Sequence, residues 1–241
     1  MVWISFAAVW WSPRHRLGPS TRSTLSIEVI SSWRSQAALA PYFLDHYRYT
    51  DRIHVIAEAG TDDETLAICA RYPNVVVDRT PPGIEEAPWL ARLNAIYRAL
   101  RCDWVFAVDA HELLFPLPWG TNPRPAMNRE HDCDLVMVEL WQVRRHRTDA
   151  DLDPRRPAVP QRRHGEPGAG AGIGGRGGRP LVVRGGLDGA WTGGRQTFER
   201  AGGALPELRT SPRTFGGVDW TRADVEPGPE RDQHLDDPRL F

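Results

Sequence analysis

The stretch Asp103–Pro116 reads DWVFAVDAHELLFP and decides how the surrounding chain is interpreted. Its four consecutive apolar residues, Val105 to Val108, follow Trp104 and end at Asp109, a pattern that indicates a short buried strand. Asp109, His111 and Glu112 follow directly. Such side chains at the end of a buried strand are costly unless they meet solvent, a cation or one another. The sequence therefore predicts a strand whose carboxyl end carries a polar site.

On both sides of this stretch, apolar residues recur alternately with the spacing of strands and of helices. Proline at position 41 is tolerated only in the first turn of its helix, and Thr61 or Asp62 can cap the helix that follows. The β-branched run at 74–78 is typical of a buried parallel strand. Strand–helix alternation with short connections predicts an α/β fold with a mostly parallel sheet flanked by helices. The expected strands are 25–32, 52–57, 74–78, 103–108 and 134–143, and the expected helices are 37–49, 61–72 and 87–100.

Ligands of open α/β sheets bind at the carboxyl ends of the strands, which directs attention to Asp109 and His111. Two residues apart on an extended backbone, their side chains project from the same side and can share a divalent ion. Mixed oxygen and nitrogen ligation suits Mn²⁺ better than Mg²⁺, and such an ion could neutralise a departing diphosphate. The residues alone leave a second interpretation open, in which the acids cap the following turn and His111 is a polar surface residue.

Three stretches together resemble family 2-type glycosyltransferases of the GT-A fold. Asp103–Pro116 is similar to the family's strand and DxD segment, with a DxH variant of the motif. Tyr42–Tyr47 followed by Asp51–Leu66 is similar to the family's FLxHYR and DRIVVYDNGSTDGTL segments, and Arg92–Asn94 to the helix before the DxD strand. The resemblance covers about residues 25–145.

This resemblance implies a GT-A-like, Rossmann-like domain that transfers a sugar from a UDP- or GDP-sugar to an acceptor hydroxyl, as in bacterial-type polysaccharide synthesis. It implies that Asp109 contacts the ribose or the metal, and that His111 ligates the metal, Mn²⁺ or Mg²⁺. Glu58 is then expected to face the base or ribose, Asp63 to hold the loop beneath the nucleotide, and Asn94 to line the donor site. A helix cap at Asp63 and a helix-surface amide at Asn94 remain alternatives.

Two departures from the family pattern give rise to a second hypothesis. Ser35 and Gln36 stand where the family tends to have Asn-Glu. No motif downstream of Asp109 matches the acidic base with which an inverting transferase deprotonates its acceptor. The alternative is therefore a catalytically inactive or truncated relic that at most binds nucleotide.

Charge and cysteine content limit the other functional classes. The 241 residues contain 30 basic residues, all arginine, and 31 acidic residues, for a net charge of −1. This balance gives no electrostatic basis for a nucleic-acid partner or a polybasic membrane contact. Three cysteines without CxxC spacing indicate neither a disulfide scaffold nor a structural zinc site. A reducing, cytoplasmic location is the expectation.

The composition divides the chain into a leader (1–24), a nucleotide-sugar-binding domain (25–150) and a tail (151–241). The apolar run Val2–Trp11 is too short to span a bilayer and lacks the features of a signal peptide. It is expected to be a packed or disordered leader or an overextended start, with a peripheral membrane anchor as the alternative. Gly, Ala, Arg or Pro make up 34 of the 50 residues from 155 to 204. This predicts a low-complexity, disordered or frame-shifted tail, and an Arg/Gly-rich interaction segment is a third hypothesis.

Overall fold

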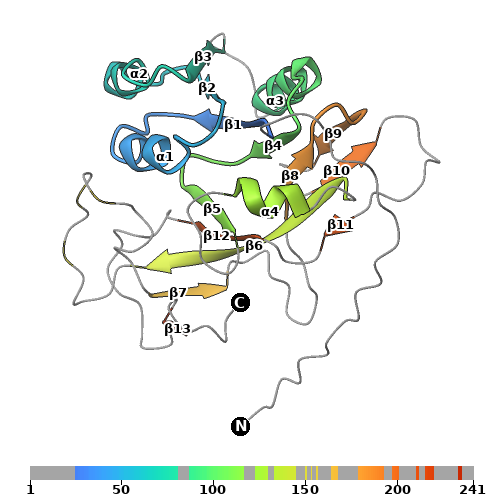
Figure 1. The fold of residues 1–241 in the computed structure, drawn as a ribbon. Coiled ribbons are helices and arrows are strands. Elements are labelled where there is room, and N and C mark those ends of the chain that lie inside the picture. Colours follow the sequence, from blue (N-terminus) through green and yellow to red (C-terminus); the bar gives the residue numbers. More distant parts are fainter. Residues whose placement is uncertain are drawn as a thin grey trace, which may run out of the picture.

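A central group of four parallel strands confirms the expected α/β class. The computed structural model describes residues 25–80, 87–116, 123–129, 133–144, 150, 153, 156, 164–167, 179–192, 197–200, 210–211, 215–219 and 233–234. Strand β1 (Ile27–Trp33) pairs in parallel with β2 (Arg52–Ala57) on one side and with β4 (Trp104–Ala107) on the other, and β3 (Val75–Arg79) pairs in parallel with β2. Figure 1 shows these strands stacked side by side, with helices beside them.

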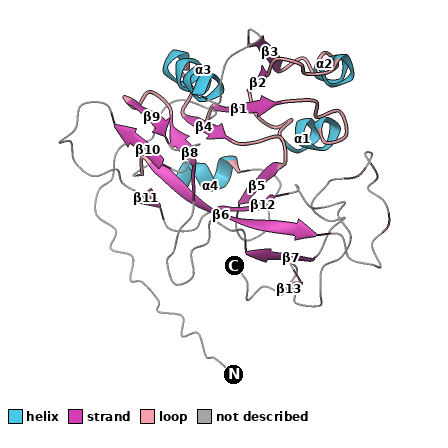
Figure 2. Cartoon of the chain, turned by 180° about the vertical axis from the view of Figure 1, so that it is seen from behind, coloured by secondary structure: helices cyan, strands magenta, loops and turns pink. Residues whose placement is uncertain are grey.

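Helices cover both faces of the parallel strands (Figures 1 and 2). Helices α1 (Ala40–His46) and α2 (Asp63–Cys69) pack against the face that carries Val29 and Val55. Helix α3 (Ala87–Ala99) packs against the opposite face, where Ile30 and Ile56 lie. The alternation of side chains along each strand thus supplies two separate apolar clusters, one for each helical layer. Pro41 lies in the first turn of α1, as expected.

The sheet continues beyond β4 through segments that lie far along the chain. Strand β8 (Arg179–Arg184) is antiparallel to β4 and to β6 (Leu135–Arg144) and lies between them. Strand β7 (His164–Pro167) pairs with the outer edge of β6, and β13 (Gln233–His234) pairs with β7. Strand β11 (Thr210–Ser211) also pairs with β6. A separate hairpin, β9 (Gly189–Thr192) with β10 (Thr197–Arg200), lies next to α3.

The folded domain therefore extends past the expected boundary at residue 150. Leu181, Val182 and Val183 of β8 are fully buried, and Trp191 and Phe198 of the β9–β10 hairpin pack against Tyr97 of α3. These short apolar segments interrupt the Gly/Arg/Pro-rich stretch and bury enough surface to join the core. The leader 1–24 and the remaining parts of the tail lie outside the described residues.

Three other expectations need correction. Strand β3 is at the edge of the described sheet and exposes 44% of Val76, although the β-branched run was expected to be buried. The expected sheet had no strand immediately after Asp109, yet β5 (Glu112–Pro116) begins there and pairs with β12 (Phe215–Asp219), which also pairs with β6. Helix α4 (Arg124–Arg129) was not expected either. Within the described segments, no helix is both long and apolar enough to cross a membrane.

Candidate functional site

The candidate site lies at the edge where β1, β2 and β4 end. Because these strands are parallel, their carboxyl ends meet at one edge, which is where open α/β sheets bind ligands. Strand β2 is followed there by Glu58, and β4 by Val108 and Asp109. The Val108 N–H still donates to the carbonyl of Ile30 at 3.1 Å, so the chain leaves β4 beside the middle of β1.

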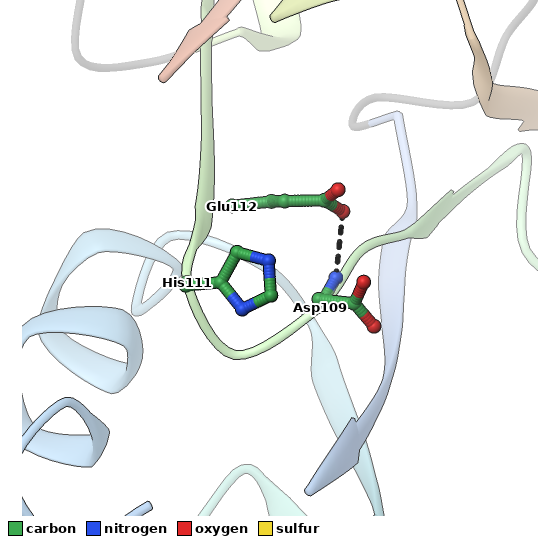
Figure 3. A group of neighbouring side chains, drawn as sticks. All are labelled: Asp109, His111 and Glu112. Carbon is green, nitrogen blue, oxygen red and sulfur yellow. Dashed lines mark hydrogen bonds between the residues drawn. The ribbon is translucent and has the colours of Figure 1, made fainter. Parts of the chain in front are cut away.

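A tight turn from Asp109 to Glu112 forms the centre of the site (Figure 3). The Glu112 N–H donates to the Asp109 carbonyl at 3.0 Å, and Oε2 of Glu112 accepts from the Asp109 N–H at 2.8 Å. The turn is therefore closed once through the main chain and once through a side chain. The expectation that the acids cap the following turn is thus met by Glu112. The assumption of an extended backbone is wrong, since the turn itself brings positions 109 and 111 together.

Asp109, His111 and Glu112 each offer a ligand atom, and these atoms all lie within 4.8 Å of one another. Oxygen ligands lie about 2.1 Å from Mg²⁺ and about 2.4 Å from Ca²⁺, so two ligands of one ion are at most about 4–5 Å apart. The residues offer a donor set that suits a divalent ion, and the cluster would have to draw together slightly around Mg²⁺. Figure 3 shows the Glu112 carboxylate and the His111 ring on the same side of the turn, with the Asp109 carboxylate directed outward.

Access to the turn is open at two of its three polar residues. Asp109 and His111 are partly exposed, whereas Glu112 is fully buried. His111 also lines a small pocket between the turn and α1, together with Leu39, Tyr42 and Phe43. A buried carboxylate is costly without hydrogen bonds or a cation. The bond from the Asp109 N–H to Glu112 supplies part of that compensation.

Glu58 lies at the carboxyl end of β2 and is tied to the end of β1. Its Oε1 accepts a hydrogen bond from the Ser32 hydroxyl at 2.8 Å, and its N–H donates to the carbonyl of Trp33 at 2.9 Å. The loop that follows is held by Thr61, whose hydroxyl bonds the carbonyls of Trp33 and Glu58 at 3.0 and 2.7 Å. Glu58 is half-buried, so its carboxylate has a fixed place at this edge while remaining accessible.

The cap of α2 is Asp62 rather than its neighbour Asp63. The Asp62 carboxylate accepts from the Thr65 N–H at 2.6 Å and from the Thr65 hydroxyl at 3.1 Å, and the first of these bonds is the main cause of its lowered pKa. Asp63 is the first residue of α2, but its side chain is outside the described part of the structure. Its expected role beneath a nucleotide stays a prediction.

Asn94 has a structural role that sequence reasoning missed. Its Nδ2 donates to the Trp191 carbonyl at 3.0 Å, and its Oδ1 accepts from the Trp191 N–H at 2.8 Å. Only 8% of the residue is exposed. Both polar atoms of the amide thus hold β9 against α3, and Asn94 does not lie on the helix surface. Its expected place in the donor site stays a prediction.

Two aromatic residues at the end of α1 contact the strand that follows the turn. The Tyr47 hydroxyl donates to the Glu112 carbonyl and accepts from the Leu114 N–H, both at 2.9 Å. His46 Nε2 lies 2.7 Å from the Leu114 carbonyl oxygen. Burial lowers the pKa of His46 to about 4, against the opposing effects of this hydrogen bond and of Asp45. His46 is therefore neutral at pH 7, and Nε2 carries the proton that it donates.

Strand β12 brings a further acidic residue to the turn. Its register pairs Asp219 directly opposite Glu112, and paired residues of antiparallel strands lie about 5 Å apart at their Cα atoms. Sequence reasoning missed Asp219 because it lies in the expected tail, more than a hundred residues after the turn.

Comparisons with known proteins leave the family open. No protein-family model matches the chain, and no curated protein matches it. Among solved structures, S. aureus TarS residues 1–349 align at 15% identity over 49% of this chain and 36% of that chain, with a TM-score of 0.40. The complexes of the same TarS fragment with UDP and with UDP-GlcNAc align at 16% and 17% identity over 54% of this chain, with TM-scores of 0.39 and 0.37. They cover 38% and 37% of the TarS fragment. This chain thus spans well under two thirds of the length of these structures.

Proposed function

We propose that this chain contributes the donor site of a divalent-metal-dependent glycosyltransferase, which moves a sugar from a nucleotide-sugar to an acceptor hydroxyl. The observation that carries the proposal is the cluster of Asp109, His111 and Glu112, whose ligand atoms lie within 4.8 Å at the carboxyl end of a central parallel strand. The resemblance of Asp103–Pro116 to the DxD segment of family 2-type glycosyltransferases supports the same reading. Sheet topology independently favours ligand binding at that edge.

In this proposal Asp109 and His111 hold the cation, Mn²⁺ or Mg²⁺. A bound cation would supply positive charge next to the diphosphate as it leaves the sugar, and such stabilisation is the largest contribution to many transfer reactions. Glu112 fixes the main chain of Asp109 through the 2.8 Å hydrogen bond. Glu58, held by Ser32, faces the base or ribose, and Asp63 supports the loop beneath the nucleotide.

A UDP-sugar is the first donor to test, with a GDP-sugar second. The distant TarS structures hold UDP and UDP-GlcNAc, which makes UDP a practical probe without assigning the sugar. A cytoplasmic location belongs to the same proposal, in keeping with three free and buried cysteines, at positions 69, 102 and 133. The hypothesis of a relic that binds nucleotide without turnover differs from this proposal only in the transfer step.

Calorimetric titration of UDP in the presence and absence of Mn²⁺ tests the proposal. Wild-type protein is expected to bind UDP in a Mn²⁺-dependent manner, and Asp109→Ala to weaken that binding at least about 100-fold, since even the outer partners of metal ligands are worth 10–100-fold. Asp188→Ala, which removes an exposed carboxylate between β8 and β9, is the matched control and should bind like wild type. Mn²⁺-independent binding, or full affinity in Asp109→Ala, would disprove the metal assignment. Release of UDP from a donor sugar then separates the enzyme from the relic.

A further inference from the structure

Strand β5 has one strand partner among the described residues, and its other edge faces the end of α1. In an antiparallel pair, the N–H and C=O groups of alternate residues point toward or away from the partner strand. The side chains at the end of α1 bond main-chain groups of Glu112 and Leu114. These residues are two positions apart, as the alternation requires. Side chains of α1 therefore satisfy the edge of β5 that a further strand would otherwise pair.

These contacts form a compact set that we call the α1 clamp, made by His46 and Tyr47. Tyr47 bonds both the Glu112 carbonyl and the Leu114 N–H at 2.9 Å, and His46 bonds the Leu114 carbonyl at 2.7 Å. The Tyr47 ring is fully buried and packs against Phe43 and His46, with ring centres 4.6 and 4.8 Å apart. Three consecutive hydrogen bonds from a packed helix end leave this backbone little freedom.

The clamp is connected to the candidate metal ligands through Glu112. Its carbonyl is held by Tyr47, its N–H closes the turn to the Asp109 carbonyl, and its carboxylate accepts from the Asp109 N–H. Displacing the Glu112 backbone would therefore alter both closures of the turn that carries Asp109 and His111. Glu112 itself is fully buried, so solvent offers no substitute partner for its carboxylate.

We propose that Tyr47 and His46 are positioning residues that fix the Asp109–Glu112 turn and so set the affinity of Asp109 and His111 for the cation and its diphosphate ligand. The identity of the ligand rests on the proposed function, whereas the fixing of the turn rests on the hydrogen bonds of the clamp. Partners that orient metal ligands from outside are generally worth 10–100-fold in metal affinity.

The experiment compares Tyr47→Phe with Tyr49→Phe in the full chain. Tyr49 belongs to the same aromatic group, with its ring centre 6.1 Å from that of Tyr47, but its buried hydroxyl has no hydrogen-bond partner in the described parts of the structure. Mn²⁺ alone, followed by electron paramagnetic resonance, and UDP with Mn²⁺, followed by calorimetry, are the probes. Tyr47→Phe is expected to weaken both affinities about tenfold or more, and Tyr49→Phe to leave them unchanged. Equal affinities in wild type and Tyr47→Phe overturn the inference.

Hydrogen exchange of the metal-free protein separates this inference from the proposed function. Tyr47→Phe should accelerate exchange of the amides from 109 to 114, whereas Tyr49→Phe should not. If wild type fails to bind Mn²⁺ while this exchange pattern appears, the proposed function fails and the clamp remains. If the exchange is unchanged, the clamp is refuted whatever the metal does.

A second pair keeps the test decisive if Tyr47→Phe does not fold. His46→Leu removes the donor to the Leu114 carbonyl, whereas His46→Gln retains an amide donor at a similar reach. His46→Gln is expected to restore most of the Mn²⁺ affinity and exchange protection lost in His46→Leu. Circular dichroism and thermal melting confirm that each variant is folded. Equal Mn²⁺ affinity in His46→Leu and wild type contradicts the proposal.

Discussion

Acidification is expected to destabilise the fold through His46. Burial lowers the pKa of His46 from 6.5 to about 4. In the unfolded chain the imidazole takes up a proton below about pH 6.5, whereas in the folded chain it stays neutral until about pH 4. The unfolded state therefore binds more protons between these values, and the free energy of unfolding falls as pH decreases through this window. Above pH 7 His46 causes no further change in the free energy of unfolding.

The magnitude follows from the difference between the two pKa values. One pKa unit corresponds to about 1.4 kcal/mol, so the loss reaches at most about 3 kcal/mol at pH 4. The His46 residue keeps partial contact with solvent, which reduces the effect of burial on its pKa. A loss of about 1–3 kcal/mol is therefore the expected range.

Urea denaturation at several pH values between 7.5 and 4.5 measures this loss, with His46→Gln as the control. Glutamine keeps a donor for Leu114 but does not titrate, so subtracting its unfolding free energies removes the contributions of the other acids and histidines. The wild-type value should fall relative to the variant below pH 6.5. Nuclear magnetic resonance titration of the His46 ring gives its pKa directly. Parallel stability profiles, or a ring that titrates near 6.5, would refute the reasoning.

Three further substitutions probe the remaining assignments. Asn94→Ala should lower the free energy of unfolding by about 2–4 kcal/mol, because it leaves the buried Trp191 N–H and C=O without the amide. The control Asn128→Ala, at an exposed position, should change the free energy of unfolding by less than about 0.5 kcal/mol. If Asn94→Ala instead loses UDP affinity at unchanged stability, Asn94 has a donor-site role. Tyr49→Phe should leave thermal stability unchanged or raise it, as it removes a buried hydroxyl that has no partner in the described segments, and clear destabilisation would contradict this. If Asp219, which pairs with Glu112, is the general base, Asp219→Asn should abolish sugar transfer while preserving UDP and Mn²⁺ affinity. Retained turnover in this variant would exclude that role.

The parallel core could be predicted because its signals are local. The apolar runs at β1, β2 and β4 and the proline at the start of α1 each act within a few residues. Asp62 caps α2 through a bond to Thr65, three residues away, so the cap is also readable from sequence. Sequence alone does not distinguish an edge strand from a central one. For that reason the β-branched run at β3 was misjudged as buried.

The remaining strands could not be predicted because their partners are distant. Strand β5 pairs with β12, about a hundred residues later, and nothing within Glu112–Pro116 specifies that partner. Strand β8 has only three consecutive apolar residues, Leu181 to Val183, in a stretch whose average composition suggests disorder. The contact of Asn94 with β9 was missed for the same reason, since Trp191 lies 97 residues away.

The three stretches that resemble glycosyltransferases differ in where they lie. Tyr42–Tyr47 ends in the α1 clamp. Asp51–Leu66 contains Glu58 and the cap of α2. Both stretches reach the edge of the sheet at which Asp109 follows β4. Arg92–Asn94 instead lies on α3, where Asn94 fastens β9 to the opposite face. The first two stretches therefore lie at the edge of the sheet where the proposed donor site would form, whereas the third packs β9 against α3. Hydrogen bonds of Tyr47 with the Glu112 carbonyl and the Leu114 N–H tie the first stretch to the turn, so a donor site at Asp109 and His111 would be positioned by the α1 clamp.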